Sequence, residues 1–117
     1  MIINQTKSYI ILEPSRNNGS KENEIILNFH QEFNEKYPNF NKVNLIIDFS
    51  NNINTDLEEI LLFSQYSVEH KKNKKSFVIV CNGIKFDELP DELVAVPTLN
   101  EAEDIIEIED IERDLGI

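Results

Sequence analysis

Five side chains that could do chemistry fall within one short stretch, NLIIDFSNNINTDLEEILLF, which spans residues 44–63. An apolar strand ends at an acidic residue, a polar loop follows, and an amphipathic helix begins. Ligand and switch sites in open α/β sheets tend to lie beyond the carboxyl ends of parallel strands. The stretch is therefore the first place to look for a functional surface, and its candidate residues are Asp48, Ser50, Thr55, Asp56 and Glu58.

The residues that most often carry enzyme chemistry are sparse in the rest of the chain. His30 and His70 lie far apart in the sequence and fit no recognised metal-ligand spacing. Cys81 ends an apolar run without a neighbouring base or cation, which favours a buried thiol over a nucleophile. Three glycines are too few for a phosphate-binding loop. We therefore expect no catalytic residue, no metal and no cofactor.

The charge of the chain is confined to its C-terminal part. Residues 1–85 contain ten basic and ten acidic residues, whereas residues 86–117 contain twelve acidic residues and only Arg113. The whole net charge of −11 therefore lies in the last 32 residues. Phosphate backbones and anionic membranes bind through cationic side chains. We accordingly expect no direct binding to nucleic acid or to a membrane.

Length and composition bound the class of protein. A chain of 117 residues is long enough for one hydrophobic core and fits one domain. It contains one cysteine, so no internal disulfide can form. No apolar run reaches the roughly 20 residues that cross a bilayer, and the first residues do not resemble a secretory leader. We expect a cytoplasmic protein.

Apolar patterning predicts an α/β fold. The continuous apolar runs 44–49 and 76–81 are typical of strands buried on both faces, and the amphipathic segment 54–72 between them has crossover length. These two strands should be adjacent and parallel. The remaining predicted elements are strands at 1–3, 8–14 and 93–96, a loop at 15–23, a helix at 25–37, a loop with one helical turn at 84–92, and an acidic helix at about 98–115. The sheet should be mixed, mostly parallel, and built from about four to five strands.

Two helix starts carry a capping-box pattern, in which a Thr and a Glu three residues later each bond a backbone N–H. These pairs are Thr55 with Glu58 and Thr98 with Glu101. The spacing within 54–72 also predicts the inner face of that helix, formed by Leu57, Ile60, Leu61, Ser64 and Val68.

The order of these segments resembles the STAS domain, the fold of anti-sigma factor antagonists. That family has an apolar strand ending in Asp or Asn, a short loop, Asp-Ser-Ser-Gly opening a helix, a basic turn and another apolar strand. Here LIIDF, INTDLEEILL, EHKKNKK and SFVIV follow in that order, and AVPTLNEAEDII is similar to the last strand and closing helix of the family. The resemblance covers about residues 8–112 and implies one STAS-like domain over 1–117.

The chain departs from the family pattern at the switch itself. Aligned without gaps from Asp48, the family's Asp falls on Asp56, its two serines on Leu57 and Glu58, and its glycine on Glu59. The serine phosphorylated in switching members would be Glu58. Either Glu58 only completes the Thr55 capping box, or its permanent negative charge mimics the phosphorylated state. A one-residue slip would place Thr55 or Ser50 nearby as substitute acceptors.

Two functions remain open. The favoured one is a non-catalytic regulatory domain that presents the loop and helix of residues 54–68 to a protein partner, without the phosphorylation switch. The alternative is an accessory or docking domain of a nucleic-acid-processing enzyme such as a ribonuclease, itself without catalytic residues, whose acidic helix holds a basic surface. A small independent enzyme is the least favoured reading.

Overall fold

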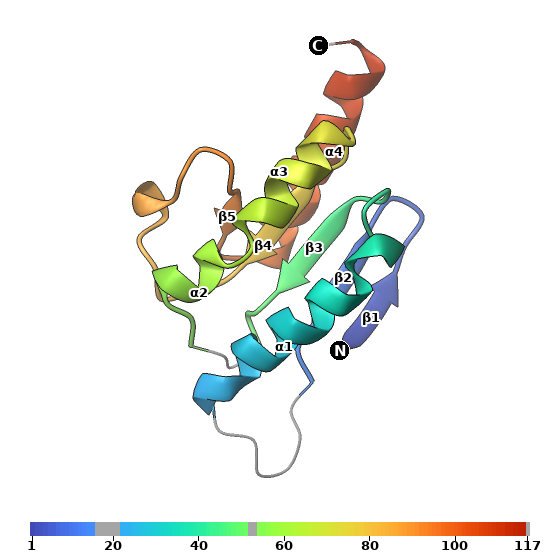
Figure 1. Cartoon of the computed structure of the whole chain (residues 1–117). Coiled ribbons are helices and arrows are strands. Elements are labelled where there is room, and N and C mark those ends of the chain that lie inside the picture. The colour runs from blue at the N-terminus through green and yellow to red at the C-terminus, as the bar shows by residue number, and fades with distance from the viewer. Residues whose placement is uncertain (16–21, 52–53, 117) are drawn as a thin grey trace.

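A five-stranded mixed sheet forms the centre of the computed structural model, which describes residues 1–15, 22–51 and 54–116 (Figure 1). The strands lie in the order in which they occur in the chain, and only the first pair is antiparallel. They are β1 (Ile2–Gln5), β2 (Ile10–Glu13), β3 (Leu45–Asp48), β4 (Phe77–Val80) and β5 (Ala95–Val96). The predicted fold class, a mixed and mostly parallel α/β sheet, is confirmed at this level.

The central pair of strands has the predicted arrangement. β3 and β4 are parallel neighbours, with Ile46 opposite Val78 and Asp48 opposite Val80. Every residue of both strands is buried. This burial on two faces explains why both segments are apolar without alternation.

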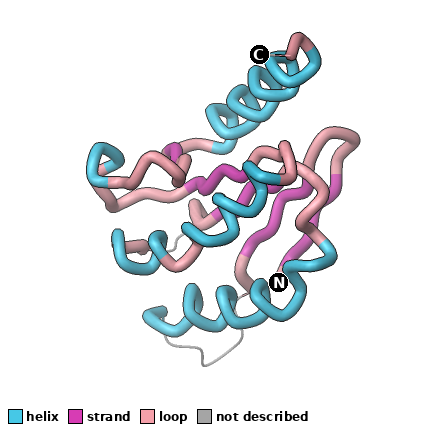
Figure 2. The backbone as a smooth tube through the Cα atoms, turned by 45° about the horizontal axis from the view of Figure 1, so that its top comes forward, coloured by secondary structure: helices cyan, strands magenta, loops and turns pink. Residues whose placement is uncertain are grey.

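Helices cover the sheet unequally. The helices are α1 (Glu22–Lys36), α2 (Leu57–Leu61), α3 (Ser64–Lys72) and α4 (Leu99–Asp114), with short 3₁₀ turns at Tyr37–Asn39 and Phe86–Glu88. Figures 1 and 2 show α1, α2 and α3 on one face of the sheet and α4 alone on the other. The turn at Phe86–Glu88 is the single helical turn predicted for 84–92.

Each sheet face has its own core. Ile47 and Ile79 point toward α1–α3, where they join a cluster rich in aromatic side chains that includes Phe29 and Phe63. On the opposite face the cluster is smaller, and it consists of Ile46, Val78, Val80, Ala102 and Ile106. The larger core therefore fixes α1–α3, and α4 rests on a thinner apolar layer.

The predicted single helix over 54–72 is wrong. The structure has two helices, with Leu62 ending α2 and Phe63 preceding α3. Phe63 is fully buried, whereas Leu61 and Val68, both expected on the inner face, are each 38% exposed. Phe63 lies three residues after Ile60 and four before Ser67, and all three are buried, so the buried face is offset from the predicted one.

Two predicted loops are described only in part. Most of the predicted loop 15–23 and part of the loop after Ser50 lie outside the described residues. Within the described ranges, no helix is both long enough and apolar enough to span a bilayer.

Candidate interaction surface

Asp48 and Ser50 form a local turn at the carboxyl end of β3. One carboxylate oxygen of Asp48 accepts a hydrogen bond from the Ser50 backbone N–H at 2.9 Å and another from the Ser50 hydroxyl at 2.6 Å. Asp48 is only 8% exposed, so these bonds satisfy a mostly buried carboxylate. The pair therefore shapes the chain as it leaves the sheet.

A second carboxylate lies beside Asp48 at the same edge of the sheet. Glu13 ends β2, the parallel neighbour of β3. Partial burial, and secondarily the negative charge of Asp48, raise the pKa of Glu13 above its usual value. Glu13 was not among the residues predicted from the sequence, although its place at the end of a predicted strand before Pro14 was a usable signal.

The prediction that Thr55 is the helix N-cap is wrong. Thr55 is 6% exposed, and its hydroxyl donates to the backbone carbonyl of Asn82 at 2.6 Å. A side chain added at Gly83, which has φ of +86°, would approach the Thr55 carbonyl oxygen to 3.2 Å. Thr55 therefore ties the loop after β3 to the loop after β4, and Gly83 makes that close approach feasible.

The helix start belongs to Asp56, one residue later. The Asp56 carboxylate accepts from the Glu59 N–H at 2.8 Å, and the Glu59 carboxylate accepts from the Asp56 N–H at 3.1 Å. This reciprocal capping box starts α2. Partial burial is the main cause that raises the pKa of Glu59. Of the second predicted box, the Thr98 N-cap is confirmed, since the Thr98 hydroxyl accepts from the Glu101 N–H at 3.2 Å, whereas the reciprocal bond from Glu101 is not found among the described residues.

Replacing Asp56 with alanine is expected to lower the free energy of unfolding by about 1 kcal/mol, because an N-cap bond is lost. Urea denaturation followed by circular dichroism measures this change. Glu58→Gln is the matched control, since it removes a carboxylate from the same turn without touching the box. Equal unfolding midpoints for Asp56→Ala and the parent would contradict the assigned cap.

Glu58 is left free by this cap. Its side chain is exposed, and it lies in the first turn of α2. The interpretation that Glu58 completes a capping box with Thr55 is therefore wrong, since Glu59 has that role. The carboxylate of Glu58 instead faces solvent.

The five predicted residues lie at one edge of the sheet but on both of its sides. Asp48 shares the sheet face of Ile46, which α4 covers, whereas α2 packs on the other face through Ile60. Among the residues that the structure describes, side-chain hydrogen bonds join only Asp48 to Ser50 within this set. Asp48 and Thr55 are buried, so Ser50, Asp56 and Glu58 are the members of this set that face solvent.

The histidines and the cysteine have structural surroundings. His70 is fully buried, with Nε2 at 3.0 Å from the Val43 carbonyl oxygen and Nδ1 at 2.7 Å from the Tyr37 hydroxyl. Burial lowers the pKa values of both His30 and His70. Burial also raises the pKa of the Cys81 thiol to about 11, which keeps it protonated at neutral pH. Within the described ranges, no three His, Cys, Asp or Glu side chains are placed to hold a metal ion.

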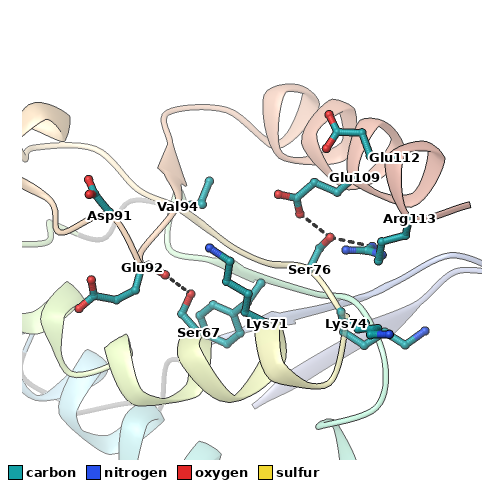
Figure 3. Close-up of a pocket in the computed structure, with 12 residues that line it drawn as sticks. Ser67, Lys71, Lys74, Ser76, Asp91, Glu92, Val94, Glu109, Glu112 and Arg113 are labelled. Atoms are coloured by element: carbon teal, nitrogen blue, oxygen red, sulfur yellow. Dashed lines mark hydrogen bonds between the residues drawn. The ribbon is translucent and has the colours of Figure 1, made fainter. Parts of the chain in front are cut away.

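A cavity of about 320 Å³ lies at the opposite end of the sheet, between α3 and α4 (Figure 3). At its wall the Ser76 hydroxyl donates to Glu109 at 2.5 Å and accepts from Arg113 at 3.0 Å. Lysines and acidic residues share the lining, including Lys71 from α3 and Glu112 from α4. These hydrogen bonds join β4 to α4, and the mixed charge of the lining favours no single class of ligand.

Comparison with known proteins adds no relationship to this geometry. No family model matches the chain, and no curated protein is significantly similar to it in sequence.

Proposed function

We propose that this chain is a non-catalytic, cytoplasmic, STAS-like interaction domain that presents the edge around Asp48, Ser50 and α2 to a protein partner. Its binding to the partner is constitutive, because Glu58 supplies a permanent negative charge where phosphorylation-switched STAS domains carry a phosphorylated serine. The proposal includes no cofactor and no direct contact with nucleic acid or membrane.

The arrangement of elements supports this proposal. The resemblance implies a parallel strand, a loop, a helix and a second parallel strand, and β3, α2–α3 and β4 occur in that order. The closing helix α4 follows a short strand, as AVPTLNEAEDII implies. The acidic residue that ends β3 leads directly into the loop that carries the proposed surface.

The single observation that carries the proposal is the exposure of Glu58. Glu58 neither caps α2 nor lies in the core, so its exposed carboxylate is accessible to a partner. A phosphate carries about −1.5 to −2 of charge and a carboxylate −1, so Glu58 keeps the sign of a phosphorylated serine at roughly half its charge. A partner that recognises the negative form would find it here without a kinase.

Quantitative affinity capture from a lysate of the source cells tests the role of Glu58. The parent should retain at least one partner that Glu58→Gln and Glu58→Ser lose by about tenfold, as expected when an interface charge is removed. Glu35→Gln removes an exposed carboxylate from the far end of α1 and should retain every partner. All three variants should fold, and the Glu58 variants should be only mildly destabilised, because a carboxylate in the first turn of a helix contributes about 0.3–1 kcal/mol.

Identical capture of partners by the parent and both Glu58 variants would contradict the proposed role of Glu58 in binding. The partner would then have to contact another part of the surface or the domain would have another function. Loss of the same partner from Glu35→Gln would show that only total charge matters.

The alternative, docking to a nucleic-acid-processing enzyme, is favoured by one observation. α4 and the segment before it carry the acidic excess of the chain. A contact made by those charges should weaken strongly as salt rises, whereas a contact centred on α2 should weaken less.

A further inference from the structure

α4 carries an exposed apolar stripe that the fold leaves without a neighbour. Ile108, Ile111 and Leu115 are 54%, 53% and 69% exposed. Their spacing of three and four residues places them on one side of the helix, extending just past its last turn. Ala102 and Ile106, which contact the sheet, lie on the opposite side. The helix is therefore apolar on two sides, and only one of them is used in the core.

A groove connects this stripe to the sheet. It has a volume of about 390 Å³ and runs between α4 and the start of β2. Its apolar walls come from Tyr9, Ile106 and Ile111, and the Tyr9 hydroxyl donates to Glu103. The other lining residues are Ser8, Glu107, Asp110 and Asp114. Ile111 belongs to both features, so the stripe and the groove form one surface, here called the α4 surface.

The sheet holds this surface in place through a buried polar contact. Asn44, which is 5% exposed, donates to the Ser8 carbonyl at 3.0 Å and to the Asp110 carboxylate at 3.1 Å. Arg113 donates to the same Asp110 carboxylate at 2.5 Å. Figures 1 and 2 both show α4 continuing past the end of the sheet. The helix is thus anchored along its inner side while its outer side remains open.

The charge around the α4 surface determines what can cover it. Among the described residues, four carboxylates and no cation line the groove, and of these carboxylates only that of Asp110 forms an ion pair, with Arg113. A second copy of this chain would bring equal negative charges together, which is unfavourable. An apolar partner with Lys or Arg beside its apolar side chains would match both the stripe and the carboxylates.

We propose that the α4 surface binds an amphipathic helical segment of a partner protein, with apolar side chains on Ile108, Ile111 and Leu115 and cationic side chains on Glu107 and Asp114. This contact is independent of the surface around Glu58. The domain then has two separate binding faces, one at the edge of the sheet and one on α4.

Fluorescence anisotropy with a defined peptide tests the proposal. The probe is a labelled peptide of about 18 residues in which Leu and Lys repeat at helical spacing. The comparison peptide has the same composition in an order without helical periodicity. The parent should bind the patterned probe at least about tenfold more tightly than the comparison peptide, since only the former presents an apolar face.

Matched variants assign the binding to α4. Ile108→Ser combined with Ile111→Ser should weaken the patterned probe by at least about tenfold, whereas Leu27→Ser, which alters a 52% exposed leucine on α1, should not. Glu107→Gln should weaken binding and Glu35→Gln should not. Glu58→Gln should bind the probe like the parent, which separates this proposal from the preceding one.

Three results would overturn the proposal. Equal affinity for the two peptides would reduce the interaction to unspecific charge attraction. Unchanged affinity in the Ile108→Ser/Ile111→Ser variant, with its unfolding midpoint preserved, would place the binding elsewhere. A dimer in sedimentation velocity that this variant abolishes would show that a second copy occupies the stripe.

Discussion

Replacing Phe63 with alanine is expected to lower the free energy of unfolding by about 3–5 kcal/mol, the usual cost of deleting a buried aromatic side chain. Phe63 is fully buried at the junction of α2 and α3. Its ring centroid lies 6.0 Å from that of Phe29, 5.8 Å from Phe33 and 5.7 Å from Phe49. The variant would therefore lose contacts with α1 and with the end of β3 at once.

Urea denaturation of Phe63→Ala and Phe63→Leu measures this loss. The leucine variant should lose less, because it fills more of the cavity. Phe86→Ala is the matched control, since Phe86 is 36% exposed in the 3₁₀ turn after β4. This substitution should lower the free energy of unfolding by about 1 kcal/mol or less, as is usual for a partly exposed residue. A cost for Phe63→Ala as small as that for Phe86→Ala would contradict the packing at the helix junction.

The same substitution links the core to the proposed interaction edge. α2 has five residues, too few to be stable as an isolated helix, and its buried side chain is Ile60. The position of Glu58 therefore depends on the packing of Ile60 and Phe63 below it. Weakening this core should loosen the surface that a partner recognises even where the chain stays folded.

The parts of the fold that the sequence predicted are those with strong local signals. β4 is apolar throughout, β3 is apolar up to Asp48, and the two are separated by one crossover length, so their parallel pairing needed no knowledge of distant contacts. The Thr98 cap was also predictable, because a strand and a proline precede it. In these cases local pattern and tertiary packing agree.

The start of α2 was not predictable from the pattern alone. Thr55-x-x-Glu58 and Asp56-x-x-Glu59 both fit a capping box, one residue apart. The choice between them is made by Asn82, whose carbonyl accepts the Thr55 hydroxyl from a loop that follows another strand. A hydrogen bond between residues 27 positions apart thus determines where α2 begins, and it leaves Glu58 outside the capping box.

The break between α2 and α3 was missed for a related reason. Leu61 and Val68 continue an apolar periodicity that suits an uninterrupted helix, yet both are exposed. The buried positions are Phe63, Tyr66 and His70, whose rings complete the aromatic core. Ile60, Phe63, Ser67 and His70 are buried at helical spacing, so the period was right but the predicted inner face was wrong, and a histidine at a basic helix end became a core residue.

Lowering the pH from about 7.5 to about 5.5 is expected to destabilise the protein through His70. The two contacts of its ring define a neutral form, in which Nε2–H donates to the Val43 carbonyl and Nδ1 accepts from the Tyr37 hydroxyl. Protonation would add a second donor toward Tyr37 and a charge in a fully buried site. Burial is the main cause that lowers the pKa of His70. Hydrogen bonding to backbone carbonyls, that of Val43 first, and then the charge of Glu69 oppose it only in part.

The sign of the effect follows from this lowered pKa. Above about pH 6.5 the histidine is neutral in both the folded and the unfolded chain, so its contribution to stability is constant. Below about pH 6.5 the unfolded chain binds a proton that the folded chain does not, and the free energy of unfolding falls by up to about 1.4 kcal/mol per pH unit for this group. His30 acts in the same direction, whereas Glu13 and Glu59, whose pKa values are raised, act in the opposite one.

Two measurements isolate His70 from these other groups. The His70→Gln variant cannot titrate but keeps an amide donor, and its unfolding free energy should depend less steeply on pH than that of the parent over the same range. In the folded parent, the NMR signal of the His70 ring should also fail to titrate near pH 6.5, where an exposed histidine does. A His70 resonance that titrates normally would contradict the buried, neutral ring, and equal pH slopes for parent and variant would assign the acid sensitivity to other groups. With the expected result, protonation of His70 weakens the contacts that α3 makes through this ring with Tyr37, Val43 and Phe77.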